Sequence, residues 1–211
     1  MEWQFVAVAT LGYLLGSISG GYLMGRLTRG IDVRDYGSGK TGGTNALRTL
    51  SFGAVLLVLV IDLGKAALAV SIARVISDDA WAQAIAGFAA VLGHVWPLFL
   101  RFRGGRGVSA AYGSLLAMNP LASLALLPIA ALIVVATRYM SLMSILMAPI
   151  AAIVFLALAF AGLVPFAYAG FGFAVAILIV ALHHDNIRRL LSGRERKIGQ
   201  RELVAPSARE G

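Results

Sequence analysis

The sequence predicts an all-α polytopic membrane protein, and three observations support this. The 211 residues are 59% hydrophobic and only 13% charged, whereas a soluble domain is about 25% charged. Apolar runs of roughly 20 residues recur along the chain, which is the length needed to cross ~30 Å of hydrocarbon. The net charge of +8 comes largely from Lys and Arg between these runs, as expected for loops on the cytoplasmic side of a membrane.

We expect about seven transmembrane helices. Their approximate ranges are 3–25, 51–76, 80–100, 107–118, 120–137, 141–161 and 163–182. The fourth run is too short to cross as a straight helix, so it must tilt, line a cavity or share its span with its neighbours. The pair Asn119-Pro120 separates it from the fifth.

Small and charged residues inside the first two runs predict how these helices pack. The first run starts without basic residues, unlike a secretory signal. It carries Gly12, Gly16 and Gly20, and this spacing of four places small residues on one ridge for close helix packing. Asp62 and Lys65 in the second run share a helix face, so we expect an intramembrane ion pair that supports the fold, with a direct functional role as the alternative.

The distribution of charge predicts the topology. All Lys and Arg residues except Lys65 and Arg74 fall on one side of the seven runs, whereas the other side carries Glu2, Asp78 and Asp79. The positive-inside rule then places the N-terminus outside and the C-terminus in the cytoplasm. We expect residues 1–198 to form a single integral-membrane domain and residues 199–211 to form a polar cytoplasmic tail.

A first polar motif spans residues 36–48. It is rich in glycine, so its backbone NH groups are able to cradle an anion. A P-loop is excluded because Arg34 stands where the pattern needs glycine. The residues that we expect to bind a phosphate are Ser38, Gly39, Gly42, Thr44, Asn45 and Arg48.

A second motif spans residues 93–107. Arg101 and Arg103 would also fit a simple stop-transfer cluster, but the glycines around Arg106 suggest that backbone and a cation approach a ligand together. His94 would fit either a packed histidine or a ligand-binding one. The candidates are His94, Arg103, Gly104, Gly105, Arg106 and Gly107.

A third motif spans residues 183–197. His183 and Asn186 are three residues apart at a helix end, so they would face the same way. The arginines that follow would also suit a basic helix on anionic lipid. All three motifs fall on the predicted cytoplasmic side, which favours a membrane enzyme or transporter for a phosphorylated compound.

Several kinds of chemistry are excluded or unsupported. The chain has no cysteine, which excludes disulfides and thiolate catalysis. The histidines are scattered without carboxylates at ligand spacing, so we expect no metal and no cofactor. No Gly-x-Ser-x-Gly sequence supports a serine hydrolase, and no histidine is followed five residues later by aspartate, as in the acyltransferases that use such a pair. The basic charge is explained by topology, so no nucleic acid is expected.

Taken together, the motifs resemble those of the bacterial membrane acyl-phosphate:glycerol-3-phosphate acyltransferases. The matches are Gly-Ser-Gly…Thr-Asn-x-x-Arg at 37–48, Gly-His-x-x-Pro-x-Phe with basic-Gly-Gly-basic-Gly-Val at 93–108, and His-x-x-Asn-Ile-x-Arg-Leu-x-x-Gly-x-Glu-x-Lys at 183–197. Asp62-x-x-Lys65 and Arg138-Tyr-x-Ser-Leu-x-Ser-Ile145 also match. The sequence departs from the family at Lys40, usually Asn, at Gly43, often Ala, and at Arg103 and Arg106, usually Lys.

The resemblance implies a reaction and a location. The enzyme would move an acyl chain from acyl phosphate to the 1-hydroxyl of glycerol 3-phosphate, giving lysophosphatidic acid and phosphate. This is the first step of phospholipid synthesis. It would lie in the bacterial plasma (inner) membrane with its site facing the cytoplasm. Its partners would be the two substrates and the lipid bilayer, with no obligate protein partner.

The resemblance also implies roles for individual residues. The catalytic residues would be His183, Asn186, Arg106 and Ser144, and Ser141 would join the phosphate-binding residues. The resemblance requires one serine in the site, and either Ser141 or Ser144 would satisfy it. Either His183 or a substrate phosphate oxygen could accept the hydroxyl proton. A transporter of phosphate or an organophosphate is the alternative function, but no internal repeat of the kind expected for it is evident.

Overall fold

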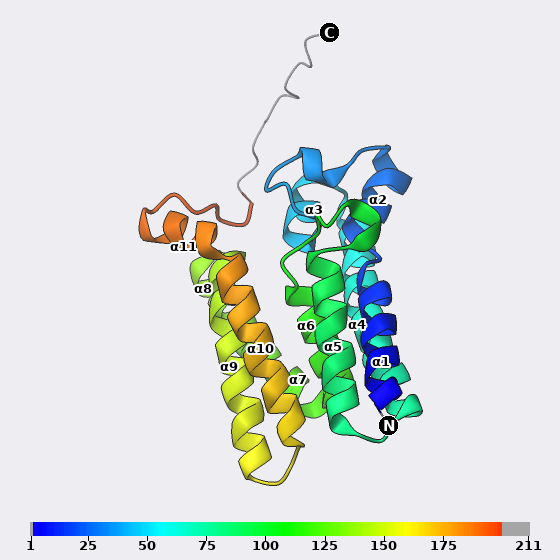
Figure 1. The fold of residues 1–211 in the computed structure, drawn as a ribbon. Coiled ribbons are helices and arrows are strands. Elements are labelled where there is room, and N and C mark those ends of the chain that lie inside the picture. Colours follow the sequence, from blue (N-terminus) through cyan, green and yellow to red (C-terminus); the bar gives the residue numbers. More distant parts are fainter. Residues whose placement is uncertain (1, 200–211) are drawn as a thin grey trace.

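The computed structural model describes residues 2–199, and every regular element in that range is a helix (Figure 1). The α-helices are α1 (Glu2–Gly16), α2 (Gly20–Arg29), α3 (Gly43–Thr49), α4 (Phe52–Ile76), α5 (Ala80–Val95), α6 (Val108–Met118), α7 (Pro120–Ala125), α8 (Leu127–Thr137), α9 (Met140–Phe160), α10 (Phe166–Leu182) and α11 (His184–Leu191). Two 3₁₀ turns, η1 (Val33–Asp35) and η2 (Leu98–Leu100), lie in the connections. The expected tail, 199–211, lies outside the described residues apart from Gly199.

All seven expected segments are helical, but fewer than seven are long enough to cross a membrane. Five helical stretches in the described range have the necessary length and apolarity: Glu2–Arg29, Phe52–Ile76, Ala80–Leu100, Pro120–Thr137 and Met140–Phe160. A sixth is reached if α10 and α11 count as one span bent by 58°. The 11 residues of α6 extend only about 16 Å, so α6 does not cross alone, as expected for the fourth run, and a count of seven is reached only if α6 is included.

The first span is broken where α1 meets α2. The Ser19 side chain accepts a hydrogen bond from the NH of Tyr22 and so caps α2, as serine commonly does at a helix start. Ser17 accepts a hydrogen bond from the NH of Leu98 and donates one to the carbonyl of Tyr13. The break therefore ties the first span to the end of the third.

The glycine ridge of the first span packs as predicted. A side chain at Gly12 or Gly16 would overlap the backbone of α5 at Ala86 or Ala90. A side chain at Gly20 would lie 2.8 Å from the carbonyl oxygen of Val58 on α4. The small residues therefore allow α1 and α2 to approach neighbouring backbones closely.

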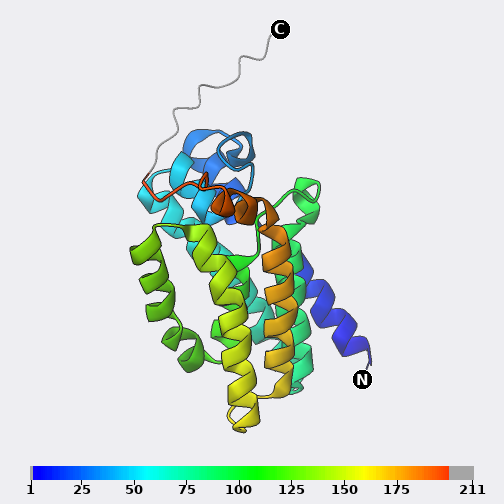
Figure 2. The same cartoon turned by 90° about the vertical axis from the view of Figure 1, so that its left-hand side faces the viewer.

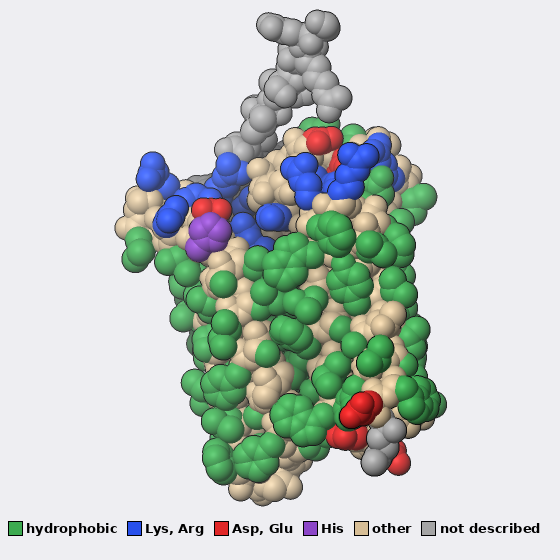
Figure 3. All heavy atoms as spheres, in the orientation of Figure 1, with side chains coloured by type: hydrophobic (Ala, Val, Ile, Leu, Met, Phe, Trp, Pro, Cys, Tyr) green, Lys and Arg blue, Asp and Glu red, His purple; other side chains and the backbone are tan. Residues whose placement is uncertain are grey.

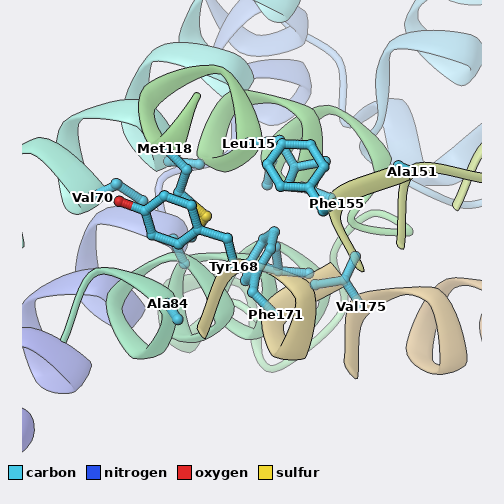
Figure 4. Packing of buried hydrophobic residues seen from close by; sticks show 14 of the residues in the cluster. Val70, Ala84, Leu115, Met118, Ala151, Phe155, Tyr168, Phe171 and Val175 are labelled. Atoms are coloured by element: carbon cyan, nitrogen blue, oxygen red, sulfur yellow. The ribbon is translucent and has the colours of Figure 1, made fainter. Parts of the chain in front are cut away.

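The apolar core lies where α4, α5, α6, α9 and α10 meet (Figure 4). Phe155 from α9 is fully buried, and Tyr168 and Phe171 from α10 pack into the same cluster. Helix α8, by contrast, has no buried residue and stands at the edge of the bundle beside α9 (Figure 2). It therefore forms an outer layer of the bundle that is one helix thick.

The two ends of the molecule differ in charge (Figure 3). Lys and Arg side chains gather at the end formed by α2, α3 and α11, and acidic side chains are visible at the opposite end near the N-terminus. A belt of hydrophobic side chains separates the two ends. The three motifs meet at the basic end, as the charge pattern predicted.

Candidate active site

A cavity of about 380 Å³ begins at the basic end and continues between the helices. Helices α4, α6, α8, α9 and α10 line its apolar part, including Leu115, Ala151 and Phe171. Residues 171 and 183 both line it and are about 18 Å apart along α10 at the usual helical rise. The polar side chains that line the cavity are Ser38, Lys40, Thr44, Asn45, His94, Ser109, Arg106, Ser144 and His183, with the phenol of Tyr112.

Asn45 holds the loop of the first motif together. Its Nδ2 lies 2.8 Å from the carbonyl oxygens of Val33 and Lys40 and 3.0 Å from that of Tyr36. Its Oδ1 accepts a hydrogen bond of 2.9 Å from the NH of Ser38. Asn45 is only 2% exposed, so its amide shapes the loop in which the neighbouring donors are presented.

The other candidates of the first motif are distributed around this loop. Ser38 and Thr44 are exposed and line the cavity. Gly39 has a φ of 67°, a left-handed conformation that glycine adopts without strain, and Gly42 lines the cavity just before α3. Arg48 is exposed on α3 and does not line the cavity, but its charge acts on Arg106.

Two glycines of the second motif pack against the end of α5. The NH groups of Gly104 and Gly105 donate to the carbonyls of Val95 and His94, at 3.1 and 3.0 Å. A side chain at either glycine would overlap His94. The close approach is therefore between this loop and the end of α5, while Gly107, with a φ of 83°, immediately precedes α6.

Arg106 is the cation of the second motif that faces the cavity. Its Nε is buried and has no hydrogen-bond partner within residues 2–199. Burial, together with the nearby charges of Arg189 and Arg48, lowers the pKa of its guanidinium below the usual value. Arg103, by contrast, is exposed and lies outside the cavity lining.

The predicted Asp62–Lys65 ion pair is confirmed, and it extends to His94. Lys65 Nζ lies 2.9 Å from Asp62 Oδ1, 2.5 Å from the carbonyl oxygen of Ile18 and 3.0 Å from His94 Nδ1. Asp62 also accepts a hydrogen bond of 3.2 Å from the NH of Gly20. The cluster joins α2, α4 and α5 and ends on a histidine that lines the cavity.

The third motif lies at the bend between α10 and α11. His183 is buried, and its Nδ1 lies 2.7 Å from the carbonyl oxygen of Ile179. A carbonyl only accepts, so the proton is on Nδ1 and the Nε2 atom is an acceptor. Burial lowers the pKa of His183 to about 4, which keeps the ring neutral at physiological pH.

Glu195 is a residue of this site to which the sequence reading gave no role. Its Oε1 accepts hydrogen bonds of 2.6 Å from both Ser141 Oγ and Asn186 Nδ2, and its Oε2 lies 2.7 Å from Arg189 Nε. The available signal was a lone acidic residue in the strongly basic segment 188–197. Glu195 brings together two predicted site residues from α9 and α11.

The two candidate serines have different surroundings. Ser144 lines the cavity and donates to the carbonyl of Met140 on its own helix, whereas Ser141 is outside the lining and bound to Glu195. Asn186 Oδ1 is buried and lacks a partner in the described part of the chain. In residues 2–199, no three His, Asp or Glu side chains lie close enough together to hold a metal ion.

Comparison with known proteins gives consistent matches over most of the chain. The family model described as Glycerol-3-phosphate acyltransferase matches residues 6–193. A glycerol-3-phosphate acyltransferase of Symbiobacterium thermophilum is 45% identical over 196 residues, covering 93% of this chain and 96% of that protein. A relative of the same name from Parasynechococcus marenigrum is 40% identical over 191 residues, or 90% and 88% of the two chains.

Two solved structures have the same fold. Both are crystal structures of PlsY (YgiH), an integral membrane glycerol 3-phosphate acyltransferase. The glycerol 3-phosphate form matches with a TM-score of 0.84 and 36% identity over 92% of this chain and 96% of that one. The lysophosphatidic acid form matches with a TM-score of 0.83 and 35% identity over 92% and 95%.

Proposed function

This chain belongs to the glycerol-3-phosphate acyltransferase family, and we propose that its acyl donor is an acyl phosphate. It is an integral membrane enzyme of the PlsY type. In the proposed reaction the acyl chain passes to the 1-hydroxyl of glycerol 3-phosphate. The products are lysophosphatidic acid and inorganic phosphate.

The observation that supports this reaction most strongly is the continuity of the cavity. One end has hydroxyl donors and the Nε of Arg106, which is unpaired among the described residues, and the remainder is an apolar slot between helices. Charge-assisted hydrogen bonds suit phosphate oxygens, and an apolar slot suits an acyl chain. An acyl phosphate combines these two features in one small molecule.

An acyl phosphate is already activated, so the reaction needs no protein nucleophile. The 1-hydroxyl oxygen forms a bond to the acyl carbon, and the bond from that carbon to the phosphate oxygen breaks. The enzyme contributes by orienting the two substrates and stabilising charge. The Ser144 hydroxyl donates to its own helix and that of Ser141 to Glu195, so neither serine is paired with a base that would make it a nucleophile.

The hydroxyl proton has two possible acceptors, His183 Nε2 and an oxygen of the substrate phosphate. The low pKa of His183 makes it a weak base, whereas acyl phosphate brings basic oxygens with it. We propose that the phosphate accepts the proton and that His183 holds the hydroxyl through a hydrogen bond. Family membership favours this enzyme over the transporter that the sequence alone left open.

The donor is tested with detergent-purified enzyme and labelled glycerol 3-phosphate, without added metal. Acyl phosphate should support formation of 1-acyl-glycerol 3-phosphate, whereas acyl-CoA and acyl carrier protein of the same chain length should not. The missing His-x-x-x-x-Asp pair motivates this strict preference. Comparable turnover with acyl-CoA would contradict the proposed donor without affecting family membership.

We also propose that the site faces the cytoplasm of a bacterial plasma membrane, on the basis of the charge asymmetry. The chain lacks cysteine, so single cysteines at positions 40 and 78 report the topology directly. An impermeant thiol reagent should label the position-78 variant in intact cells and the position-40 variant only after lysis. Labelling at position 40 in intact cells would reverse the proposed orientation.

A further inference from the structure

The buried cluster of Asp62, Lys65 and His94 is more elaborate than packing of three helices requires. All three side chains are at most 6% exposed. Asp62 and Lys65 bind the backbone at the break in the first span. The third member, His94, lines the cavity. The hydrogen bonds within the cluster determine which nitrogen of that histidine carries the proton.

The three hydrogens of the Lys65 ammonium have three acceptors. These are Asp62 Oδ1 at 2.9 Å, the carbonyl oxygen of Ile18 at 2.5 Å and His94 Nδ1 at 3.0 Å. An ammonium group donates and never accepts, so His94 Nδ1 must be unprotonated. The separation of His94 Nδ1 from Asp62 Oδ1 is 3.5 Å, too long for a competing hydrogen bond.

The ring proton of neutral His94 is therefore on Nε2. This nitrogen lies against Gly105, where an added side chain would overlap it. The adjacent residue is Arg106, which lines the same cavity as His94. Among the described residues, none accepts a hydrogen bond from His94 Nε2, so this donor is available to a molecule in the cavity.

We propose that His94 is a catalytic residue whose Nε2–H donates to the carbonyl oxygen of the acyl group, with Lys65 and Asp62 as positioning residues. A neutral donor suits an oxygen that becomes charged only during reaction. When the hydroxyl attacks, the carbonyl π electrons move onto this oxygen. They return as the leaving group departs with its bonding pair, and His94 keeps its proton throughout. The inference does not depend on which activated acyl donor is used.

His94 and His183 then have complementary roles. Lys65 leaves His94 as a donor, whereas the carbonyl of Ile179 leaves His183 as an acceptor. Attack of a hydroxyl on a carbonyl needs both: an acceptor for the hydroxyl and a donor for the carbonyl oxygen. His94 is on α5 and His183 is at the bend between α10 and α11, but both line one cavity.

Nitrogen NMR of the histidine rings tests the tautomer. In the double variant His183→Asn, His184→Gln, His94 is the only remaining histidine. With ¹⁵N-labelled histidine in detergent micelles at neutral pH, we expect a neutral ring protonated on Nε2. Wild-type enzyme has three histidine rings, and its spectrum should likewise contain one neutral ring protonated on Nε2, beside the His183 ring protonated on Nδ1. A His94 ring protonated on Nδ1, or on both nitrogens, would overturn the proposal.

Steady-state kinetics test the donor. His94→Asn keeps an acceptor near the position of Nδ1 but withdraws the donor from the cavity, whereas His94→Gln places an amide NH near the position of Nε2. Loss of an oxyanion donor typically lowers kcat by ~10²–10³-fold, so we expect that loss in His94→Asn, little change in KM, and partial recovery in His94→Gln. The control is His184→Gln, because His184 is exposed and should leave kcat unchanged.

Two kinetic results would contradict the proposal. Wild-type kcat in folded His94→Asn would show that no donor is needed at this position. A rise confined to the KM for glycerol 3-phosphate would place His94 at that substrate instead. If Lys65→Met in the single-histidine background leaves the ring purely Nε2-protonated, the positioning role of Lys65 is also refuted.

Discussion

At the residue scale, the Nε of Arg106, which has no hydrogen-bond partner in the described part of the chain, has the most direct consequence for activity. It is a buried donor beside the cavity, which is unfavourable unless a ligand completes its hydrogen bonding. A phosphate oxygen would do so, and the guanidinium fork would also fix the orientation of the phosphate. The neighbouring Arg103 offers a comparison with the same charge in a different setting.

We predict that Arg106→Ala lowers kcat/KM by about 10- to 150-fold, which corresponds to the ~1.5–3 kcal/mol of a charge-assisted hydrogen bond. Arg103→Ala should stay within a few-fold of wild type because Arg103 is exposed and outside the cavity lining. Steady-state kinetics of both variants in the same detergent provide the measurement. Equal losses would show that the two arginines act only through their charge.

The role of His183 is resolved by the pH dependence of kcat. If the substrate phosphate accepts the proton, His183→Asn keeps a hydrogen-bonding group, loses no more than about tenfold in rate and retains the wild-type decline at low pH. If His183 is the base, the variant should lose the ~10²–10⁴-fold typical of general-base catalysis. The decline of the wild-type rate would then follow the pKa of about 4 and be absent from the variant. We predict the first outcome.

At the element scale, Glu195 fastens the segment after α11 to the start of α9. Burial alone would raise the pKa of its carboxyl, but hydrogen bonds from Ser141, Asn186 and Arg189 hold the pKa below its usual value. The carboxylate is only 6% exposed. Its three partners come from two helices, so its loss would loosen the bend that carries His183.

We predict that Glu195→Gln destabilises the enzyme by about 1–3 kcal/mol at neutral pH, because the amide cannot accept all three hydrogen bonds. A carboxyl whose pKa is lowered in the folded state stabilises the fold above its unfolded pKa of ~4.3, and this contribution is lost as pH falls below that value. Thermal unfolding in detergent should therefore separate the two proteins at pH 7, and the difference should shrink as pH is lowered below ~4.3. A constant difference across that range would contradict the ionised role of Glu195.

The contact between α1 and α5 gives a second prediction at this scale. Gly12→Ala places a methyl group against the backbone of Ala86, and such overpacking typically costs 1–3 kcal/mol. Gly64→Ala is the matched control, because nothing lies within 4 Å of a side chain at Gly64 and alanine favours helix. Gly12→Ala should lower the unfolding temperature, and Gly64→Ala should maintain or raise it. The packing account fails if both variants behave alike.

At the scale of the whole molecule, helices and motifs were predictable but the contacts between them were less so. Apolar run length and the Gly12–Gly16–Gly20 spacing correctly indicated the helices and their close packing, because both are local properties of the chain. The length of the run at 107–118 correctly indicated that α6 is too short to cross alone, but not which helices surround it. The break between α1 and α2 depends on Ser17 bonding to Leu98, a contact that no periodicity encodes.

In the site, too, the sequence predicted the segments that take part but not the contacts between their side chains. Clusters of Gly, Arg and polar residues indicated the segments that meet at the basic end, but not what each side chain does there. Asn45 folds its own loop, Gly104 and Gly105 accommodate His94, and Glu195 reaches Ser141 from 54 positions away. Such pairings follow from how the helices are arranged, so sequence spacing alone could not assign them.

If one cavity holds both the acyl chain and the reacting groups, photolabelling should locate the end of the chain in the apolar slot. An acyl phosphate with a diazirine at the end of its chain should label residues of the apolar slot, such as Leu115, Ala151 and Phe171. Unlabelled acyl phosphate should compete. A second apolar groove of about 230 Å³ lies between α9 and α10 and includes Ile153, Phe173 and Ile177. Competitive labelling in the slot is the predicted result, and competitive labelling confined to that second groove would contradict the account.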